Sequence, residues 1–232
     1  MKNLIFIVIL TAVLAAAGCS SATENANTTV NSAPANEQAN AAPVEPAVTE
    51  PFKPSENPKD DLLDSTRRLQ AHDYWAATLE NSLMPDMKAE LEYVKPDRYH
   101  IKNPEGEIII IGSSAYAREN DGWEKLPADL GAEINRMRQN FNTAGALDSI
   151  GEVKKTGTET VDGKEATIYA YSLKEDALPV KNLTRVWIAN DTGLPLKIVV
   201  ETENADQKQT VTTKYDYTKT VKIEAPEVKE AK

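Results

Sequence analysis

Residues 184–202, TRVWIANDTGLPLKIVVET, contain the pattern that decides the fold. Apolar residues recur at every second position on both sides of the turn Asp191-Thr192-Gly193, as Val186 and Ile188 before it and as Ile198 and Val200 after it. Alternation with a period of two predicts half-buried strands, here over Thr184–Asn190 and Leu194–Thr202. Because so short a turn can join only antiparallel neighbours, the stretch predicts a β-hairpin.

The same pattern continues on both sides of this hairpin. Further strands are predicted over Glu152–Thr160, Lys164–Leu173 and Lys208–Tyr217. Short polar segments such as Asp162-Gly163 separate successive strands, and they have the composition of tight turns. The second half of the chain therefore predicts an antiparallel meander.

The first half of the chain predicts another series of short strands. These cover Met87–Tyr93, Arg98–Lys102, Ile108–Ile111, Ala115–Arg118 and Trp123–Leu126. Lys95-Pro96-Asp97 and Asn103-Pro104-Glu105-Gly106 have turn composition and separate the first three. Four consecutive isoleucines at 108–111 place apolar side chains on both faces, so we expect this strand to be covered on both.

Two segments have a helical period instead. Asn57 is a suitable N-cap, Pro58 suits the first helical position, and a helix is expected from Pro58 to about Ala71. A second apolar face recurs at spacings of four, three and four, through Leu130, Ile134, Met137 and Phe141. This second helix either covers the sheet core or acts as a movable lid over a cavity, and the sequence leaves both readings open.

The order of these elements predicts a mainly β fold. About ten antiparallel strands in one sheet rarely stay flat, and they curl into a barrel or half-barrel. Two helices are too few to cover such a sheet completely. The expected fold is a curved antiparallel sheet forming an unclosed half-barrel covered by helices, with a concave apolar surface as a plausible ligand site.

The first 18 residues have the features of a secretory signal peptide. Lys2 precedes a short apolar run, and small residues come before Cys19, the single cysteine of the chain. The apolar run is too short to span a bilayer comfortably. An isolated thiol is unusual in an exported protein, and its position directly after Ala16-Ala17-Gly18 resembles a bacterial lipobox. That resemblance implies lipidation of Cys19 and, through Ser20, a place in the outer membrane.

The remaining segments follow from composition. Residues 19–57 are rich in Ala, Asn, Glu and Pro with no apolar period, so we expect a disordered tether, about 35 Å between its ends as a coil. Residues 58–226 form the expected single domain, and residues 227–232 a charged tail. The formal net charge of −10 argues against binding to nucleic acid or to anionic headgroups.

No enzymatic constellation is recognisable in the sequence. His72 and His100 belong to no metal-binding spacing, and the cysteine is assigned to the anchor. No Gly-x-Ser-x-Gly elbow, phosphate-binding glycine loop or calcium loop occurs. Glu201 and Glu203 share one strand face, where a solvated surface is a simpler explanation than a cation site. We therefore predict no enzyme, no metal and no cofactor.

Several turns and strand ends resemble those of the LolA-like superfamily, which includes the LppX/LprG-like lipoproteins. The matching segments are Lys95–His100, Glu107–Gly112, Tyr116–Arg118, Gly122–Lys125 and Val186–Lys197. The resemblance spans most of the expected domain and implies an unclosed β-barrel with a helical lid. It also implies a cavity that holds acyl chains or another hydrophobic surface.

The sequence then predicts which residues line such a cavity. Alternation selects Leu91, Ile108, Ile110, Val186, Ile198 and Val211 as the lining, with the helix of residues 130–141 as the gate. The function expected is that of a membrane-anchored carrier or acceptor for a lipid or a lipoprotein acyl chain, such as palmitate. The alternative is an envelope sensor or scaffold that binds a partner protein, for which an exposed sheet edge would serve.

Overall fold

The computed structural model describes residues 51–119, 122–127, 149–174, 181–203 and 207–228. These residues form one helix and one antiparallel sheet of eleven strands. In chain order the elements are α2 (Pro58–Ala71), β1 (Tyr74–Asn81), β2 (Met84–Val94), β3 (Arg98–Asn103), β4 (Gly106–Ile111), β5 (Ser114–Glu119), β6 (Gly122–Lys125), β7 (Lys154–Val161), β8 (Lys164–Tyr171), β9 (Lys181–Ala189), β10 (Pro195–Glu203) and β11 (Lys208–Asp216).

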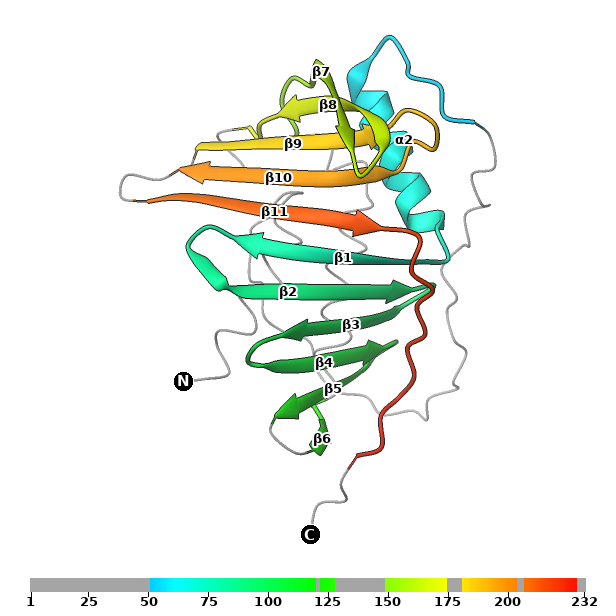
Figure 1. Cartoon of the computed structure of the whole chain (residues 1–232), viewed down its shortest axis with the longest axis vertical. Coiled ribbons are helices and arrows are strands. Elements are labelled where there is room, and N and C mark those ends of the chain that lie inside the picture. The colour runs from blue at the N-terminus through cyan, green and yellow to red at the C-terminus, as the bar shows by residue number, and fades with distance from the viewer. Residues whose placement is uncertain (1–50, 120–121, 128–148, 175–180, 204–206, 229–232) are drawn as a thin grey trace, which may run out of the picture.

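The sheet is built from two meanders joined through the first and last strands. Its order is β6-β5-β4-β3-β2-β1-β11-β10-β9-β8-β7, and β1 pairs with β11 in antiparallel register (Figure 1). The strands β6 and β7 lie at opposite edges and do not pair with each other. The structure therefore confirms the predicted mainly β class and the unclosed half-barrel.

The hairpin at residues 184–202 forms strands β9 and β10, as predicted. Gly193 in its turn has a φ of +70°, a left-handed conformation that favours glycine. A Cβ atom at this position would lie 2.5 Å from the ring of Phe52. The turn therefore needs glycine both for its backbone angle and for the close approach of that ring.

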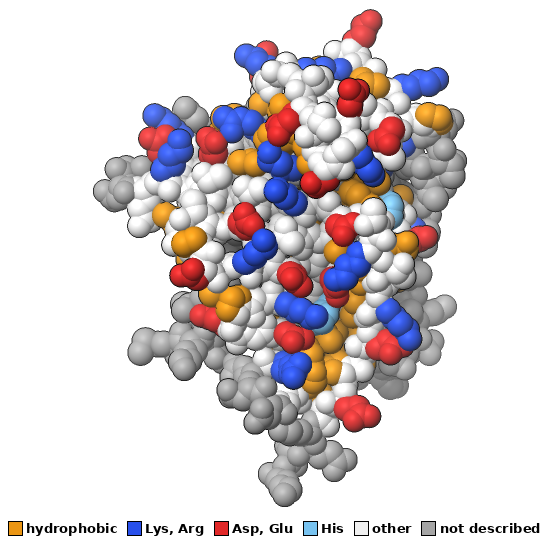
Figure 2. Space-filling view, viewed as in Figure 1, with side chains coloured by type: hydrophobic (Ala, Val, Ile, Leu, Met, Phe, Trp, Pro, Cys, Tyr) orange, Lys and Arg blue, Asp and Glu red, His pale blue; other side chains and the backbone are white. Residues whose placement is uncertain are grey.

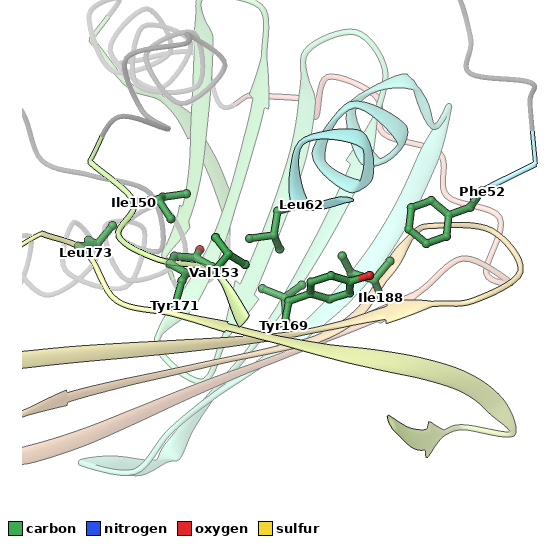
Figure 3. Packing of buried hydrophobic residues seen from close by; sticks show 9 residues of the cluster. Phe52, Leu62, Ile150, Val153, Tyr169, Tyr171, Leu173 and Ile188 are labelled. Atoms are coloured by element: carbon green, nitrogen blue, oxygen red, sulfur yellow. The ribbon is translucent and has the colours of Figure 1, made fainter. Parts of the chain in front are cut away.

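The helix α2 begins and ends where the sequence predicts. The Asn57 side chain caps it by accepting a hydrogen bond from the backbone N–H of Lys59, 3.2 Å away. Asp60 and Asp61 occupy the first turn and Arg68 the last, which suits the helix dipole. Leu62 points from this helix onto the sheet, toward Tyr169 and Ile188 (Figure 3).

The folded domain starts before the predicted boundary at residue 58. Phe52, which the sequence assigned to the tether, is only 6% exposed and belongs to the hydrophobic core under α2. The guanidinium of Arg68 lies 5.5 Å from the centre of its ring. A single aromatic residue in an otherwise polar segment is therefore the point at which the chain joins the domain.

The isoleucine strand β4 is covered on both faces, as predicted. Ile110 is fully buried on the side of α2, whereas Ile109 is buried on the opposite side. The cover on that opposite side comes from residues 217–228, here called the C-terminal strap. Val221 and Ile223 of the strap pack in the same cluster as Ile109, and the Arg98 guanidinium donates to the Ile223 carbonyl at 2.7 Å. In Figure 1 the strap runs across the ends of strands β1–β6.

Candidate functional site

The six predicted lining residues all lie on the face of the sheet that is turned toward α2, here called the inner face. Directly paired residues of antiparallel strands share a face. Leu91 pairs with Ile101, which pairs with Ile108, and Val186 pairs with Ile198. Ile110 and Val211 follow by alternation along β4 and β11. That these residues contact a ligand stays a prediction.

The inner face carries two large apolar clusters and a smaller third one of Leu79, Ala89 and Val211. The α2 cluster consists of Phe52, Leu62, Ile150, Val153, Tyr169, Tyr171, Leu173, Val186 and Ile188, with Ile198 packed against it (Figure 3). The meander cluster consists of Trp75, Ala77, Leu91, Tyr93, Ile101, Ile110 and Ala115, with Leu69, Tyr99, Ile108, Leu126, Tyr215 and Tyr217 packed against it. Since Leu62 and Leu69 belong to different clusters, α2 bridges the two.

Several inner-face side chains are only half-buried. Ile108, Ile198, Tyr99 and Tyr215 keep part of their surface accessible, while Ile110 and Ile188 beside them are fully buried. The fully buried residues make the packed core of the domain. The half-buried ones are the apolar atoms that a ligand on this face can reach.

A buried carboxylate joins α2 to the rest of the domain. Asp61 is 2% exposed and accepts hydrogen bonds from the Tyr169 hydroxyl at 2.8 Å and the Ser55 backbone N–H at 2.6 Å. The Lys155 ammonium lies 2.9 Å from the same carboxylate. Burial acts to raise the pKa of Asp61, but these three donors outweigh it and hold the pKa below its usual value.

This carboxylate gives a pH-dependent prediction. Because the pKa of Asp61 is lower in the folded than in the unfolded state, its stabilisation is complete above about pH 4 and is lost as the pH falls further. Asp61→Asn should cost about 2 kcal/mol at neutral pH, since Tyr169 and Lys155 lose their charged acceptor. Urea unfolding at neutral and acid pH measures both effects.

The neighbouring Asp60 provides the control for that experiment. Asp60 lies in the same first turn of α2 but is exposed, so Asp60→Asn keeps the helix and the buried network. We expect Asp60→Asn to retain the acid sensitivity of the parent protein and Asp61→Asn to show a smaller difference between the two pH values. Equal acid sensitivity of the two variants would show that Asp61 does not carry the effect.

Two tyrosines, Tyr171 of the α2 cluster and Tyr215 beside the meander cluster, lie close enough to influence each other electrostatically. Burial raises the pKa of Tyr171 to about 12, although a hydrogen bond with the Thr184 side chain acts against this. Burial also raises the pKa of Tyr215, and the proximity of Tyr171 raises it further. Both phenols therefore stay neutral on the inner face, as hydrogen-bonding groups without charge.

The geometry of the sheet can now be compared with known proteins. No protein-family model matches the sequence, and no curated protein matches it as a relative. The chain superimposes on the lipoprotein LppX of Mycobacterium tuberculosis with a TM-score of 0.55, over 72% of this chain and 98% of that one. It has the LppX fold. LprF of Mycobacterium bovis matches with a TM-score of 0.54, over 75% of this chain and 99% of that one. Both share 12% sequence identity with this chain, so the likeness is one of fold.

This likeness confirms the fold that the sequence resemblance implied. The predicted lid residues Leu130, Ile134, Met137 and Phe141 lie outside the described residues, as do Cys19 and the leader. Leu126 packs against the meander cluster and Ile150 belongs to the α2 cluster. The described residues on either side of this segment, Leu126 and Ile150, therefore both lie on the inner face.

The outer face, away from α2, combines charged side chains with two apolar clusters, one around Ile109 and one around Trp187. Figure 2 shows acidic and basic side chains distributed over it. His100 lies on β3, inside the sheet between β2 and β4. Its ring lies between Glu92, at 3.3 Å, and Glu107, at 3.0 Å. Glu201 pairs with Arg185 at 2.8 Å. Within the described residues no group of three or more His, Cys, Asp or Glu is placed to hold a metal ion.

An open groove of about 510 Å³ also lies on the outer side of the sheet. The tip of the β7–β8 hairpin, with Val161 and Lys164, forms one wall, and Lys214 and Lys219 line it from the other side. Glu90 and Glu92 are among its lining residues, so the groove carries both signs of charge. No sequence pattern predicts this groove, because its lining residues come from strands that are distant along the chain.

Proposed function

We propose that the protein is a lipid-anchored lipoprotein of the cell envelope that binds the acyl chain of a lipid or a lipoprotein on its inner face, without enzymatic activity. The observation that carries the proposal is the apolar inner face, whose two large clusters extend from β5 to β8 and are bridged by α2. The LppX fold supports the same reading, since LppX is itself a lipoprotein.

The binding energy comes from burial of apolar surface. Ile108 and Tyr99 present half-buried apolar side chains on the neighbouring strands β4 and β3, and Ile198 presents another on β10, in the other half of the inner face. Each Å² of apolar surface removed from water contributes about 25 cal/mol, so an acyl chain of roughly sixteen carbons gains several kcal/mol. No covalent chemistry is needed to hold such a chain, and its release requires only a competing apolar environment.

The anchor determines which role suits the protein. An acylated Cys19 keeps the protein on its membrane, and the segment before Phe52 gives the domain reach away from that membrane. A carrier that diffuses between membranes has no use for a permanent anchor. The arrangement therefore favours an acceptor or holder in the outer membrane, with its domain in the periplasm, over a soluble shuttle.

Native mass spectrometry of the protein purified from its own membranes tests the proposal directly. Gentle detergent release should yield a folded domain with a non-covalently bound lipid, whose mass is lost on collisional activation. The acyl groups on Cys19 should remain, since they are covalent. A domain that is free of lipid, and that takes up no acyl probe afterwards, would remove the proposal and leave the partner-binding scaffold.

Blocking variants locate the site. Ile108→Trp and Ile198→Trp add bulk to half-buried inner-face positions, so each should weaken binding of a fluorescent fatty acid at least tenfold. Thr212→Trp is the matched control, because Thr212 is half-buried on the outer face and pairs with Val199. Circular dichroism confirms that each variant is folded before titration. Equal affinity in all three variants would place the site elsewhere.

A further inference from the structure

The buried polar side chains of the described residues gather on one side of the sheet. They are Asp61, Ser65, Thr184 and Thr213. Thr184 and Thr213 lie on the inner face, and Asp61 and Ser65 are buried residues of α2. Asp61 is satisfied by three donors, and Thr184 is hydrogen-bonded to Tyr171. The Ser65 hydroxyl, 3% exposed as a residue, has no hydrogen-bond partner in this part of the structure.

Ser65 occupies the point where the two apolar clusters meet. Residues three and four apart lie on one face of a helix, which places Ser65 between Leu62 and Leu69. Leu62 packs in the α2 cluster and Leu69 packs against the meander cluster. Figure 3 shows Leu62 directed from α2 onto the sheet, and Ser65 follows it by about one turn. Its buried hydroxyl therefore lies on the face of α2 that packs on both clusters.

The neighbouring threonine shows what is unusual about this serine. A hydroxyl in a helix commonly donates to the carbonyl four residues earlier. Thr66 does this, with its hydroxyl 2.9 Å from the Leu62 carbonyl on the exposed side of α2. Ser65 has no such bond, although a buried unpaired hydroxyl costs free energy in the folded state. A group that is absent from the structure and accepts a hydrogen bond would remove that cost.

The charges around α2 indicate what kind of acceptor fits. Lys155 faces the Asp61 carboxylate at 2.9 Å, and Arg68 faces the Asp64 carboxylate at 2.7 Å. Because both cations are already paired, neither is available to neutralise a phosphate or a free carboxylate brought in beside Ser65. An uncharged oxygen, such as an ester or amide carbonyl, can accept from the hydroxyl without a counter-ion.

We propose that Ser65 donates a hydrogen bond to an uncharged carbonyl oxygen of the bound acyl lipid, and so fixes where the head of the acyl chain lies beneath α2. The hydrocarbon then extends over the meander cluster. This inference rests on the proposed function, because it assigns a residue and a ligand chemistry to the same inner face.

Two probes that differ only in the ester group test the proposed hydrogen bond from Ser65. The probes are methyl 1-pyrenedecanoate and decylpyrene, titrated by fluorescence against the parent protein, Ser65→Ala and Thr66→Ala. Ser65→Ala should bind the ester about fivefold more weakly, the effect of one neutral hydrogen bond, and should bind the hydrocarbon unchanged. Its thermal unfolding midpoint without ligand should rise, since an unpaired buried hydroxyl is removed. Thr66→Ala should leave the affinity for both probes unchanged.

The possible results separate this inference from the proposed function. If the parent protein binds both probes and Ser65→Ala binds the ester equally well, the hydroxyl is only a packing defect and the inference is wrong while the proposed function stands. Tighter binding of the ionised 1-pyrenedecanoate than of its methyl ester would also overturn the inference. Binding of neither probe by the parent protein would refute both proposals.

Discussion

Deleting residues 219–232 is expected to destabilise the domain by about 5 kcal/mol. The deletion removes Val221 and Ile223, which are 8% and 3% exposed and which cover Ile109 on the outer face. It also removes the carbonyl that binds Arg98 and the ammonium that pairs with Glu92. The apolar patch left behind should in addition promote self-association. Urea unfolding and size-exclusion chromatography measure the two effects.

A shorter deletion provides the control. Removing only residues 229–232 takes away the charged end of the chain and leaves the strap through Val228 in place, including the backbone bridge between Trp123 and Val228. We expect this variant to unfold at the same urea concentration as the parent protein. If the longer deletion does so too, the strap does not contribute to the stability of the sheet.

Replacing Cys19 by serine should move the protein from the membrane fraction to the soluble fraction of its cell envelope. An acylated cysteine buries chain methylenes in the bilayer at about 0.8 kcal/mol each, and several chains together hold a protein firmly. Within the described residues, no helix has the length and apolar character needed to cross a bilayer. Cell fractionation followed by immunoblotting measures the distribution.

Ser21→Ala is the matched control for the anchor, since it changes a nearby hydroxyl and keeps the thiol. The Ser21→Ala variant should stay in the membrane fraction. Inhibition of lipoprotein signal-peptide cleavage, as by globomycin, should cause its unprocessed precursor to accumulate there. Retention of Cys19→Ser in membranes after a high-salt wash would refute lipidation as the means of attachment.

The local structure of the sheet could be predicted because turns and alternation are local signals. Asn57 and Pro58 specify the start of α2, and Asp191-Thr192-Gly193 specifies the turn of the hairpin formed by β9 and β10. The four isoleucines of β4 correctly indicated cover on both faces. In each case the residues that determine the element are neighbours in the sequence.

The pairing of distant segments could not be predicted in the same way. No turn connects β1 to β11, so nothing local specifies that Ala77 lies opposite Tyr215. Phe52 was assigned to the tether because its neighbours are polar, yet Gly193 and Arg68 provide its contacts.

The candidate site shows the same division. Alternation alone was enough to place Leu91, Val186 and Ile198 on one face, because a strand has only two faces. No sequence pattern indicated that the hydroxyl of Ser65 is buried and unpaired. A serine at a buried helical position is indistinguishable in sequence from one facing solvent until the neighbouring elements are known.

The pairing of β1 with β11 also governs the order in which the fold can be completed. A chain synthesised from its N-terminus completes β1–β6 before residues 208–216 are made, so the edge of β1 has no partner until then. The seam at the centre of the sheet is the last to close, and contacts between such distant segments form slowly. Until β11 pairs with it, that edge is exposed to proteases and to pairing with other strands. A chain that stops before Lys208 would lack the strand that joins the two meanders, and both would keep an unpaired edge at the centre of the sheet.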